Sequence, residues 1–198
     1  MKNKPRNLSI GIDPGTKNGA IAIVDDSYNI IYLAKAPYIS VNTSKKVKPK
    51  LNKETGLYET TYRQRTLTDF KALRAIFLPF VNDNIILTIE KVSVRPTEGE
   101  MSSFVFGNSL GIFEGQYSFL DPFAFYEPTP QTWKKELGVT SDKETSITRA
   151  EDLFQCNLKD YLPKRAKKKD DIAEALLLSY YGMMMYRKEI DGETNNGN

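Results

Sequence analysis

Residues 8–24 read LSIGIDPGTKNGAIAIV. Two short runs rich in β-branched residues, 8–12 and 20–24, flank a Pro-Gly-Thr-Lys-Asn-Gly connection, and this pattern predicts a β-hairpin. Asp13 falls where the first strand ends, beside the sharp turn that Pro14 and Gly15 favour. A carboxylate at the end of a strand suits a metal ligand, but it also suits a residue that caps the turn with its own side chain. This stretch alone leaves both interpretations open.

Length and composition indicate one domain. A chain of 198 residues is long enough for one buried core and too short for two ordinary domains around a cleft. We expect the domain at residues 1–187, with 188–198 as a disordered polar tail. No apolar run approaches the roughly 20 residues needed to span a bilayer, so we expect no membrane partner and a cytoplasmic location, in bacteria or phage-infected cells.

Two residue counts exclude whole classes of chemistry. The single cysteine, Cys156, excludes an internal disulfide and a cysteine-based zinc site. The chain has no histidine. Serine–histidine and cysteine–histidine catalysis, histidine general bases and most catalytic zinc sites are therefore excluded.

An α/β pattern follows the hairpin. Residues 28–35 predict a third antiparallel strand, and residues 37–66 predict a lysine-rich excursion from the sheet in which 56–62 could pair as an extra ribbon. Thr68 suits the N-cap of a helix with apolar residues at three- and four-residue spacing up to Phe80. The apolar run 85–92 then predicts a buried central strand.

The second half is mostly helical. In residues 102–120 a glycine recurs every four residues, which indicates a bare stripe for close packing of this helix on the sheet. Residues 123–127 predict a short strand and 129–137 a helix. The capping-box spacing of Ser141 and Glu144 starts the next helix. The last helix runs from Asp170 to Tyr186.

Carboxylates recur in three separated segments. Glu90 interrupts a strand otherwise suited to burial, where it needs a cation shared with Asp13, unless it forms a salt bridge to Lys91 or lies at the surface near the strand end. At the start of the last helix, the acids three and four residues apart share a face; they would repel unless a cation lies between them, or they would complement the helix dipole. These acids are Asp170, Asp171 and Glu174. Oxygen-only ligands select Mg²⁺ or Mn²⁺, which indicates a nuclease acting on phosphodiesters.

Basic residues gather in two segments although the net charge is only +3. The first covers residues 45–53, and the second, 164–169, directly precedes the helix acids. Each could hold phosphates or be a solvated loop. Trp133 and its two following lysines could likewise hold a nucleic-acid backbone, or be a core tryptophan with two solvated lysines. The candidate DNA contacts are Lys17, Arg95, Phe104, Lys134, Lys135, Lys143, Lys164, Arg165, Lys167, Lys168 and Lys169.

Three motifs resemble those of RuvC-type Holliday junction resolvases, and they are more similar to the viral and phage branch than to the typical bacterial enzyme. They are IGIDPGTKNG at 10–19, TIEKV at 88–92 and KKDDIAEALLL at 168–178, and the resemblance extends over most of the chain. It implies a ribonuclease H-like fold: a five-stranded mixed sheet, its first three strands antiparallel, with helices on both faces.

The resemblance also implies a homodimer that grips a four-way DNA junction and makes symmetric paired nicks, with two Mg²⁺ ions per subunit that Mn²⁺ can replace. Asp13 and Glu90 match the first two ligands. Glu174 stands where many relatives have Asp, and Asp171 ranks before Asp170 as its partner. In the expected mechanism, ions bridged by Asp13 orient a water for in-line attack on the scissile phosphate.

Three alternatives remain. One is a nuclease for replication forks or RNA–DNA hybrids, and another is a junction-binding protein without activity. The segment 11–17 also looks like the phosphate-binding hairpin of actin-like ATPases and sugar kinases, but these need two domains around a nucleotide cleft.

Overall fold

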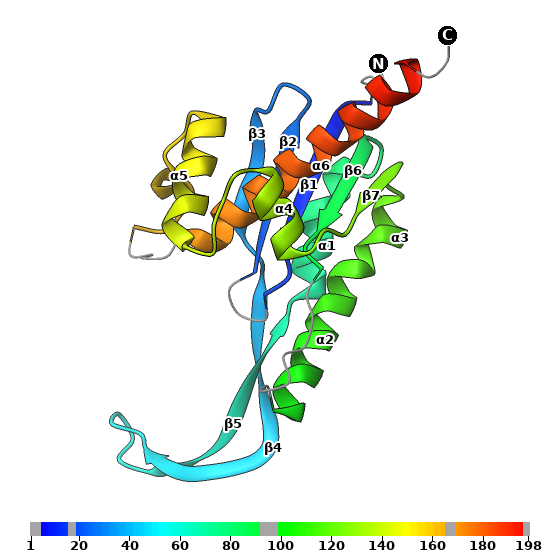
Figure 1. Cartoon of the computed structure of the whole chain (residues 1–198). Helices are drawn as coiled ribbons and strands as arrows, with labels where there is room; N and C mark the ends of the chain where they lie inside the picture. Colours follow the sequence, from blue (N-terminus) through cyan, green and yellow to red (C-terminus); the bar gives the residue numbers. More distant parts are fainter. Residues whose placement is uncertain (1–4, 16–18, 92–98, 165–168, 196–198) are drawn as a thin grey trace.

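Five strands form one mixed sheet in the order β3-β2-β1-β6-β7 (Figure 1). The computed structural model describes residues 5–15, 19–91, 99–164 and 169–195. The first three strands are antiparallel neighbours, and β6 and β7 run parallel to β1. Their bounds are β1 Asn7–Asp13, β2 Ala20–Asp25, β3 Ile30–Lys35, β6 Asn84–Ile89 and β7 Ala124–Tyr126. The predicted sheet is thereby confirmed.

Helices cover both faces of this sheet, and the two apolar clusters on either side show which helix covers which face. One face packs against α1 (Phe70–Phe77), α2 (Glu100–Glu114) and α3 (Gln116–Leu120). The other packs against α4 (Pro130–Glu136), α5 (Lys143–Phe154) and α6 (Asp170–Asn195). Two short 3₁₀ turns, Leu78–Phe80 and Leu158–Tyr161, complete the described helical elements.

Large and small side chains alternate along β1, and their size determines how closely the helices on each face pack against this strand. The large residues Leu8, Ile10 and Ile12 of β1 face α1 and α2. Gly11, between them, faces α6, and a Cβ built there would lie 2.2 Å from the carbonyl oxygen of Ala175. The backbone of α6 therefore rests directly on β1, a distance that only glycine permits.

The lysine-rich excursion forms a separate two-stranded antiparallel ribbon, β4 (Tyr38–Leu51) with β5 (Tyr58–Thr68). Figure 1 shows it extending away from the sheet and bending along its length. Both strands are longer than the 56–62 pairing that the sequence suggests, and the ribbon is not part of the five-stranded sheet.

Two helix starts differ from prediction. The side chain of Asp69, rather than Thr68, accepts hydrogen bonds from the first amides of α1. The Thr68 hydroxyl is instead bonded to the Ser109 hydroxyl at 2.7 Å, inside the core. At α5 the cap is Asp142, not Ser141. In both places an aspartate one residue further along accepts from the free amides instead.

The glycine stripe of α2 does not pack closely on the sheet. Cβ atoms built at Gly107 and Gly111 would meet nothing within 4 Å, and the one at Gly115 would meet only backbone of its own helix. The prediction of close helix–sheet packing at these glycines is therefore wrong. The close approach is made by α6, at Gly11 of β1 and at its own Gly182.

The last helix also continues beyond Tyr186, to Asn195, through the segment for which the sequence predicts a disordered tail. Two side-chain contacts hold its first part: Lys188 pairs with Glu136 of α4, and Glu189 accepts a 2.8 Å hydrogen bond from the Tyr126 hydroxyl. The single-domain division at 1–187 stays a prediction. Among the described residues, no helix is long and apolar enough to cross a membrane.

Candidate active site

Two acids from neighbouring strands meet at one edge of the sheet. Asp13 is the last residue of β1, and Glu90 directly follows the parallel strand β6. The amide of Glu90 donates to the carbonyl of Ile12 at 3.1 Å, which fixes the two strand ends side by side. Because side chains alternate along a strand, Asp13 shares the face of Gly11 and points to the α6 side.

The first turns of α6 bring further carboxylates to this edge. Burial is the main cause that raises the pKa of Asp13 well above its ordinary value, followed by the negative charges of Glu90, Glu174 and Asp171. We call Asp13, Glu90, Asp171 and Glu174 the acid centre. Acids from three elements separated in sequence thus influence the pKa of Asp13, and their role as a shared metal site stays a prediction. The seat of α6 on Gly11 sets the distance between strand acids and helix acids.

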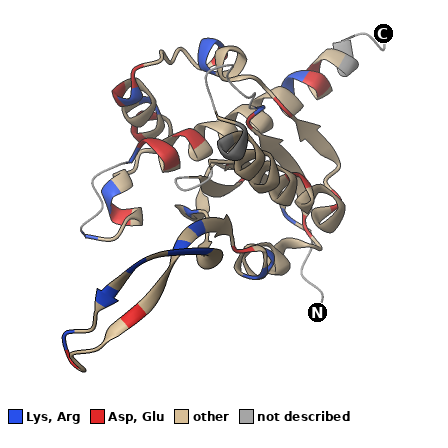
Figure 2. Cartoon of the chain, turned by 90° about the horizontal axis from the view of Figure 1, so that it is seen from below, with Lys and Arg blue, Asp and Glu red and all other residues tan. Residues whose placement is uncertain are grey.

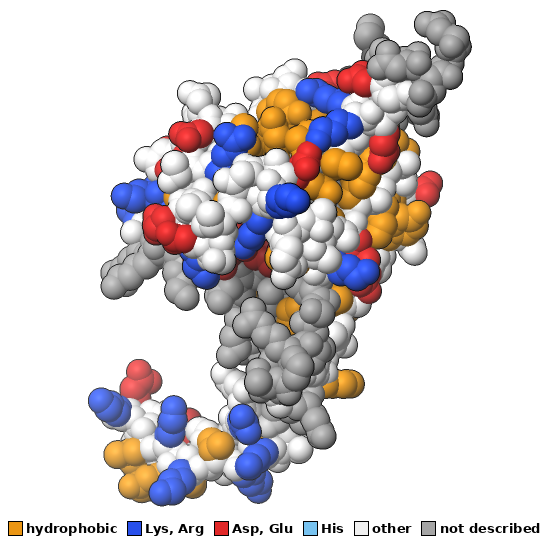
Figure 3. All heavy atoms as spheres, viewed as in Figure 1, with side chains coloured by type: hydrophobic (Ala, Val, Ile, Leu, Met, Phe, Trp, Pro, Cys, Tyr) orange, Lys and Arg blue, Asp and Glu red, His pale blue; other side chains and the backbone are white. Residues whose placement is uncertain are grey.

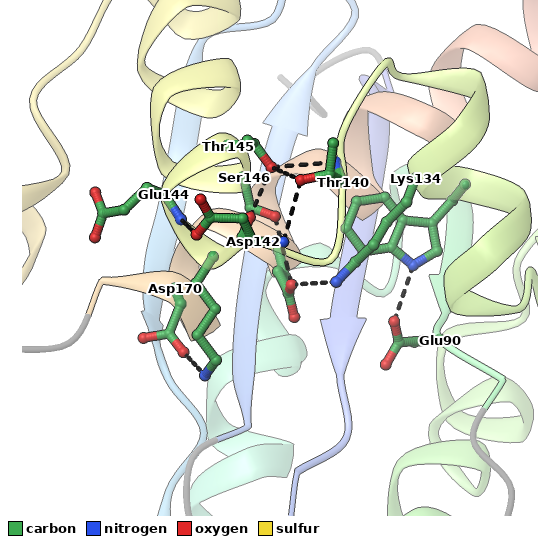
Figure 4. Close-up of polar contacts among 11 residues, drawn as sticks. Glu90, Lys134, Thr140, Asp142, Glu144, Thr145, Ser146 and Asp170 are labelled. Carbon is green, nitrogen blue, oxygen red and sulfur yellow. Dashed lines mark hydrogen bonds and ion pairs between the residues drawn. The ribbon is translucent and has the colours of Figure 1, made fainter.

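Trp133 of α4 orients Glu90. Its indole Nε1–H donates to Glu90 Oε1 at 2.9 Å, and both side chains are buried (Figure 4). Burial raises the pKa of Glu90; the Trp133 hydrogen bond and the charge of Lys134 oppose that rise, while Glu174 adds to it. Trp133 is a core residue, as one of its two interpretations predicts, but Lys134 beside it is ion-paired with Glu174 rather than solvated. The polar edge of the Trp133 indole supports Glu90. The predicted alternative partner of Glu90, Lys91, is exposed.

Each helix acid is paired with a lysine from another element. Lys35 Nζ, at the end of β3, lies 2.7 Å from Asp171 Oδ2. Lys134 Nζ lies 2.6 Å from Glu174 Oε1, and the Ser146 hydroxyl donates to the same oxygen at 3.4 Å. Asp170 pairs with Lys143 of α5. Figure 4 shows Asp170 in a separate group from Lys134 and Glu90. Asp170 therefore has a different immediate partner from the residues of the acid centre.

Tyr38, the first residue of the ribbon, holds the turn that follows Asp13. Its hydroxyl donates to the carbonyl of Gly15 and accepts from the amide of Gly19 at 2.9 Å. Burial raises the pKa of Tyr38, and the charges of Asp13 and Asp171 add to the rise, so the phenol stays protonated. Gly19 has no room for a side chain, since a Cβ there would lie 2.6 Å from the Asp13 carbonyl oxygen. Neither Tyr38 nor Lys35 is a candidate in the sequence, because no local pattern links either residue to Asp13 or Asp171.

The donor set of the acid centre suits a hard divalent cation. All four side chains offer only carboxylate oxygens, which Mg²⁺ and Mn²⁺ prefer. In the described part of the chain, no three acidic or cysteine side chains are already arranged as a metal site. The crowding that raises the pKa of Asp13 is the electrostatic condition that a bound cation relieves.

The candidate DNA contacts predicted from the sequence divide into three groups. Lys17, Arg95, Arg165, Lys167 and Lys168 lie outside the described residues. Phe104, Lys135 and Lys164 are exposed. Lys134, Lys143 and Lys169 are engaged in ion pairs, the last with Glu151 at 3.0 Å.

The fold is similar to that of Holliday junction resolvases. The structure of Thermus thermophilus RuvC in complex with a Holliday junction substrate superposes with a TM-score of 0.52 at 11% identity, covering 91% of this chain and 96% of that one. The yeast mitochondrial Holliday junction resolvase Ydc2 gives a TM-score of 0.49 at 16% identity, covering 95% and 85%. No protein-family model matches the sequence, and no curated protein matches it either. The chain thus has the ribonuclease H-like fold of RuvC.

The raised pKa of Asp13 predicts how stability depends on pH. A carboxylate whose folded pKa exceeds its unfolded value of about 3.9 binds more protons when folded, so the free energy of unfolding falls as pH rises between the two values. Glu90 acts in the same direction. We expect the melting temperature of the protein in EDTA to fall as the pH rises from about 4, the unfolded pKa, through the raised folded pKa of Asp13.

Asp13→Asn should flatten that pH profile, because its side chain cannot ionise. Thermal unfolding of both proteins across the same buffers checks this. Parallel profiles for the two proteins would contradict the assignment of a raised pKa to Asp13.

Proposed function

We propose that this chain is a divalent-metal-dependent endonuclease that cleaves branched DNA, with the four-way junction as its substrate. The observation that carries the proposal is the convergence of Asp13, Glu90, Asp171 and Glu174 at one edge of the sheet, beneath the start of α6. The likeness in fold to RuvC, whose structure holds a Holliday junction, supports the choice of substrate. The similarity of the motifs to the viral and phage branch stays a prediction.

The residues of the acid centre would bind the metal ions from two sides. Asp13 and Glu90, fixed by strand ends, would hold the metal ions from below, while Asp171 and Glu174 would close the site from α6. Bound Mg²⁺ supplies an activated water and neutralises the departing oxygen. Asp170 can join through the same helical turn.

The paired lysines would meet the phosphate. Lys35 and Lys134 lie against the two helix acids, where a cationic side chain can exchange a carboxylate for a phosphate oxygen. Trp133 would keep the Glu90 carboxylate aimed through its 2.9 Å hydrogen bond. Paired nicks on two strands need two such sites, so we propose a homodimer as the active form.

A nicking assay tests the proposal. The substrates are a synthetic four-way junction, a linear duplex, a Y-fork and an RNA–DNA hybrid, each with Mg²⁺, Mn²⁺ or EDTA. We expect metal-dependent paired nicks on the junction and far slower cleavage of the duplex. Equal cleavage of forks or hybrids would assign a broader nuclease. Junction binding without cleavage under any metal condition would reject the nuclease and favour a junction-binding protein.

A further inference from the structure

The ribbon carries more positive charge than the whole molecule. Residues 38–68 contain seven Lys or Arg and two Glu, whereas the full chain has a net charge of only +3. The rest of the chain is therefore net negative. The basic residues are Lys45, Lys46, Lys48, Lys50, Lys53, Arg63 and Arg65, and all of them are exposed. Figure 2 shows Lys and Arg along much of the ribbon, with few acids between them.

The outer part of the ribbon also exposes apolar and aromatic side chains. Tyr58 is 74% exposed and Leu57 67%, and Leu51 and Tyr62 are exposed as well. In the antiparallel register Tyr62 lies opposite Lys46, and Tyr58 lies opposite Leu51. Directly opposed residues share a face, so Tyr62 lies beside Lys46 and Tyr58 beside Leu51. Figure 3 shows this mixture of basic and apolar side chains at the end of the ribbon.

A two-stranded ribbon alone is marginally stable in water, so its length requires another stabilising contact. Bulges between Asn42 and Lys46 and between Val47 and Lys50 bend it. A shallow groove lies along it, lined by residues that include Asn42, Lys50 and Tyr62.

The length of the ribbon suits a DNA duplex. The 14 residues of β4 would span about 45 Å at 3.3 Å per residue. The major groove of duplex DNA admits an element of this kind, a two-stranded β-ribbon.

The base of the ribbon is tied to the acid centre. Tyr38, at its start, binds the turn after Asp13, and Lys35, three residues earlier, pairs with Asp171. Thr68, at its end, is bonded to Ser109 of α2 in the core. The ribbon therefore starts beside the sheet edge that holds the acids, and its other end is fixed in the core against α2.

We propose that the β4–β5 ribbon is an arm that binds the phosphate backbone of a DNA duplex and directs that duplex to the acid centre. The proposal rests on the proposed function for the identity of the substrate, but binding by the arm needs neither a metal nor cleavage. Charge favours a polyanion over contact between two arms, because the arm of a second copy would be equally positive. The exposed tyrosines add contacts to sugars and bases.

Neutralising two arm lysines tests the proposal. K46Q/K48Q is compared with K71Q/K188Q, which removes two exposed lysines from α1 and from the distal part of α6. Anisotropy of a labelled four-way junction and a linear duplex is measured in EDTA at several salt concentrations. We expect K46Q/K48Q to bind both about tenfold more weakly and to reduce the salt slope by about 2, since each phosphate contact contributes about 0.9. The control should stay within about twofold, because it removes no phosphate contact.

A shortened ribbon gives a second, larger change. Replacing residues 42–64 with Asn-Gly joins the paired residues Val41 and Arg65 by a two-residue turn and keeps the base intact. We expect a larger loss of affinity than in K46Q/K48Q, with an unchanged circular dichroism spectrum in the helical region.

Three outcomes separate the proposals. Wild-type affinity and salt slope in K46Q/K48Q would overturn the arm. Sedimentation could instead show that K46Q/K48Q has lost an oligomer that the wild type forms, and that this change explains its whole loss of DNA affinity. That result would assign the ribbon to contact between copies and overturn the arm as well. Reduced binding in both ribbon variants, combined with no cleavage by the wild type, would uphold the arm and reject only the nuclease.

Discussion

Asp13→Asn should abolish cleavage while leaving DNA binding intact. Asp13 ends β1 beside Glu90 and on the α6 side of the sheet, so its loss would remove one of the four carboxylates that we propose hold the metal. Metal ions contribute several kcal/mol to such reactions, and a loss of about 4 kcal/mol lowers the rate about 1,000-fold. Nicking rates of the four-way junction in Mg²⁺ measure the effect, and anisotropy in EDTA measures binding.

The same variant should not be less stable. Asparagine keeps an oxygen that can accept from the Gly15 amide, as Asp13 Oδ1 does at 3.3 Å. It also removes a negative charge from beside Glu90, Glu174 and Asp171. We therefore expect a melting temperature at neutral pH equal to or above that of the wild type. Asp152→Asn, at an exposed position of α5, is the matched control and should cleave normally. Wild-type nicking by purified Asp13→Asn protein would reject the acid centre as the catalytic site.

Gly11→Ala should be among the most destabilising single-methyl changes in the molecule. The new Cβ would lie 2.2 Å from the Ala175 carbonyl oxygen and 2.3 Å from the Ser179 amide nitrogen, and both are backbone atoms of α6. A flexible side chain could move away, but here the whole helix must move. Overpacking costs 1–3 kcal/mol in typical cores, and we expect about 3 kcal/mol or more here. Urea unfolding measures it.

The displacement of α6 should also lower activity in the molecules that remain folded, because Asp171 and Glu174 move with the helix. Gly107→Ala is the control. It adds the same methyl group where nothing lies within 4 Å, on the open face of α2. It should stabilise the protein by about 0.5–1 kcal/mol through helix propensity. Equal effects of the two substitutions would contradict the close seat of α6 on β1.

The sequence predicts the sheet and the strand acids because both depend on local patterns. Alternating β-branched runs around a Pro-Gly turn define β1 and β2, and Asp13 is placed by the end of that run. Glu90 is conspicuous because a carboxylate in an apolar strand needs a partner. The helix acids follow from spacing within one turn. Each of these signals lies within a few residues.

The features of the candidate site that the sequence does not predict depend on contacts between distant segments. The lysine partners come from β3, α4 and α5, and no spacing within the helix acids reveals them. Trp133 is separated from Glu90 by 43 residues. The glycine stripe of α2 has the same local pattern as a packing surface, but tertiary structure leaves it open. Gly11, a single glycine in a strand, forms the tight contact instead.

The position of α6 over β1 has a consequence for the order in which the protein is built. The Ser9 hydroxyl donates to the carbonyl of Ser179, so the first strand and the last helix close a contact across 170 residues. During synthesis the hairpin with Asp13 emerges early, but the helix acids follow almost every other described element. Contacts of such high sequence separation form slowly. The acid centre is therefore completed only when α6 docks on β1, so every element between these two must be synthesised before the proposed site can form.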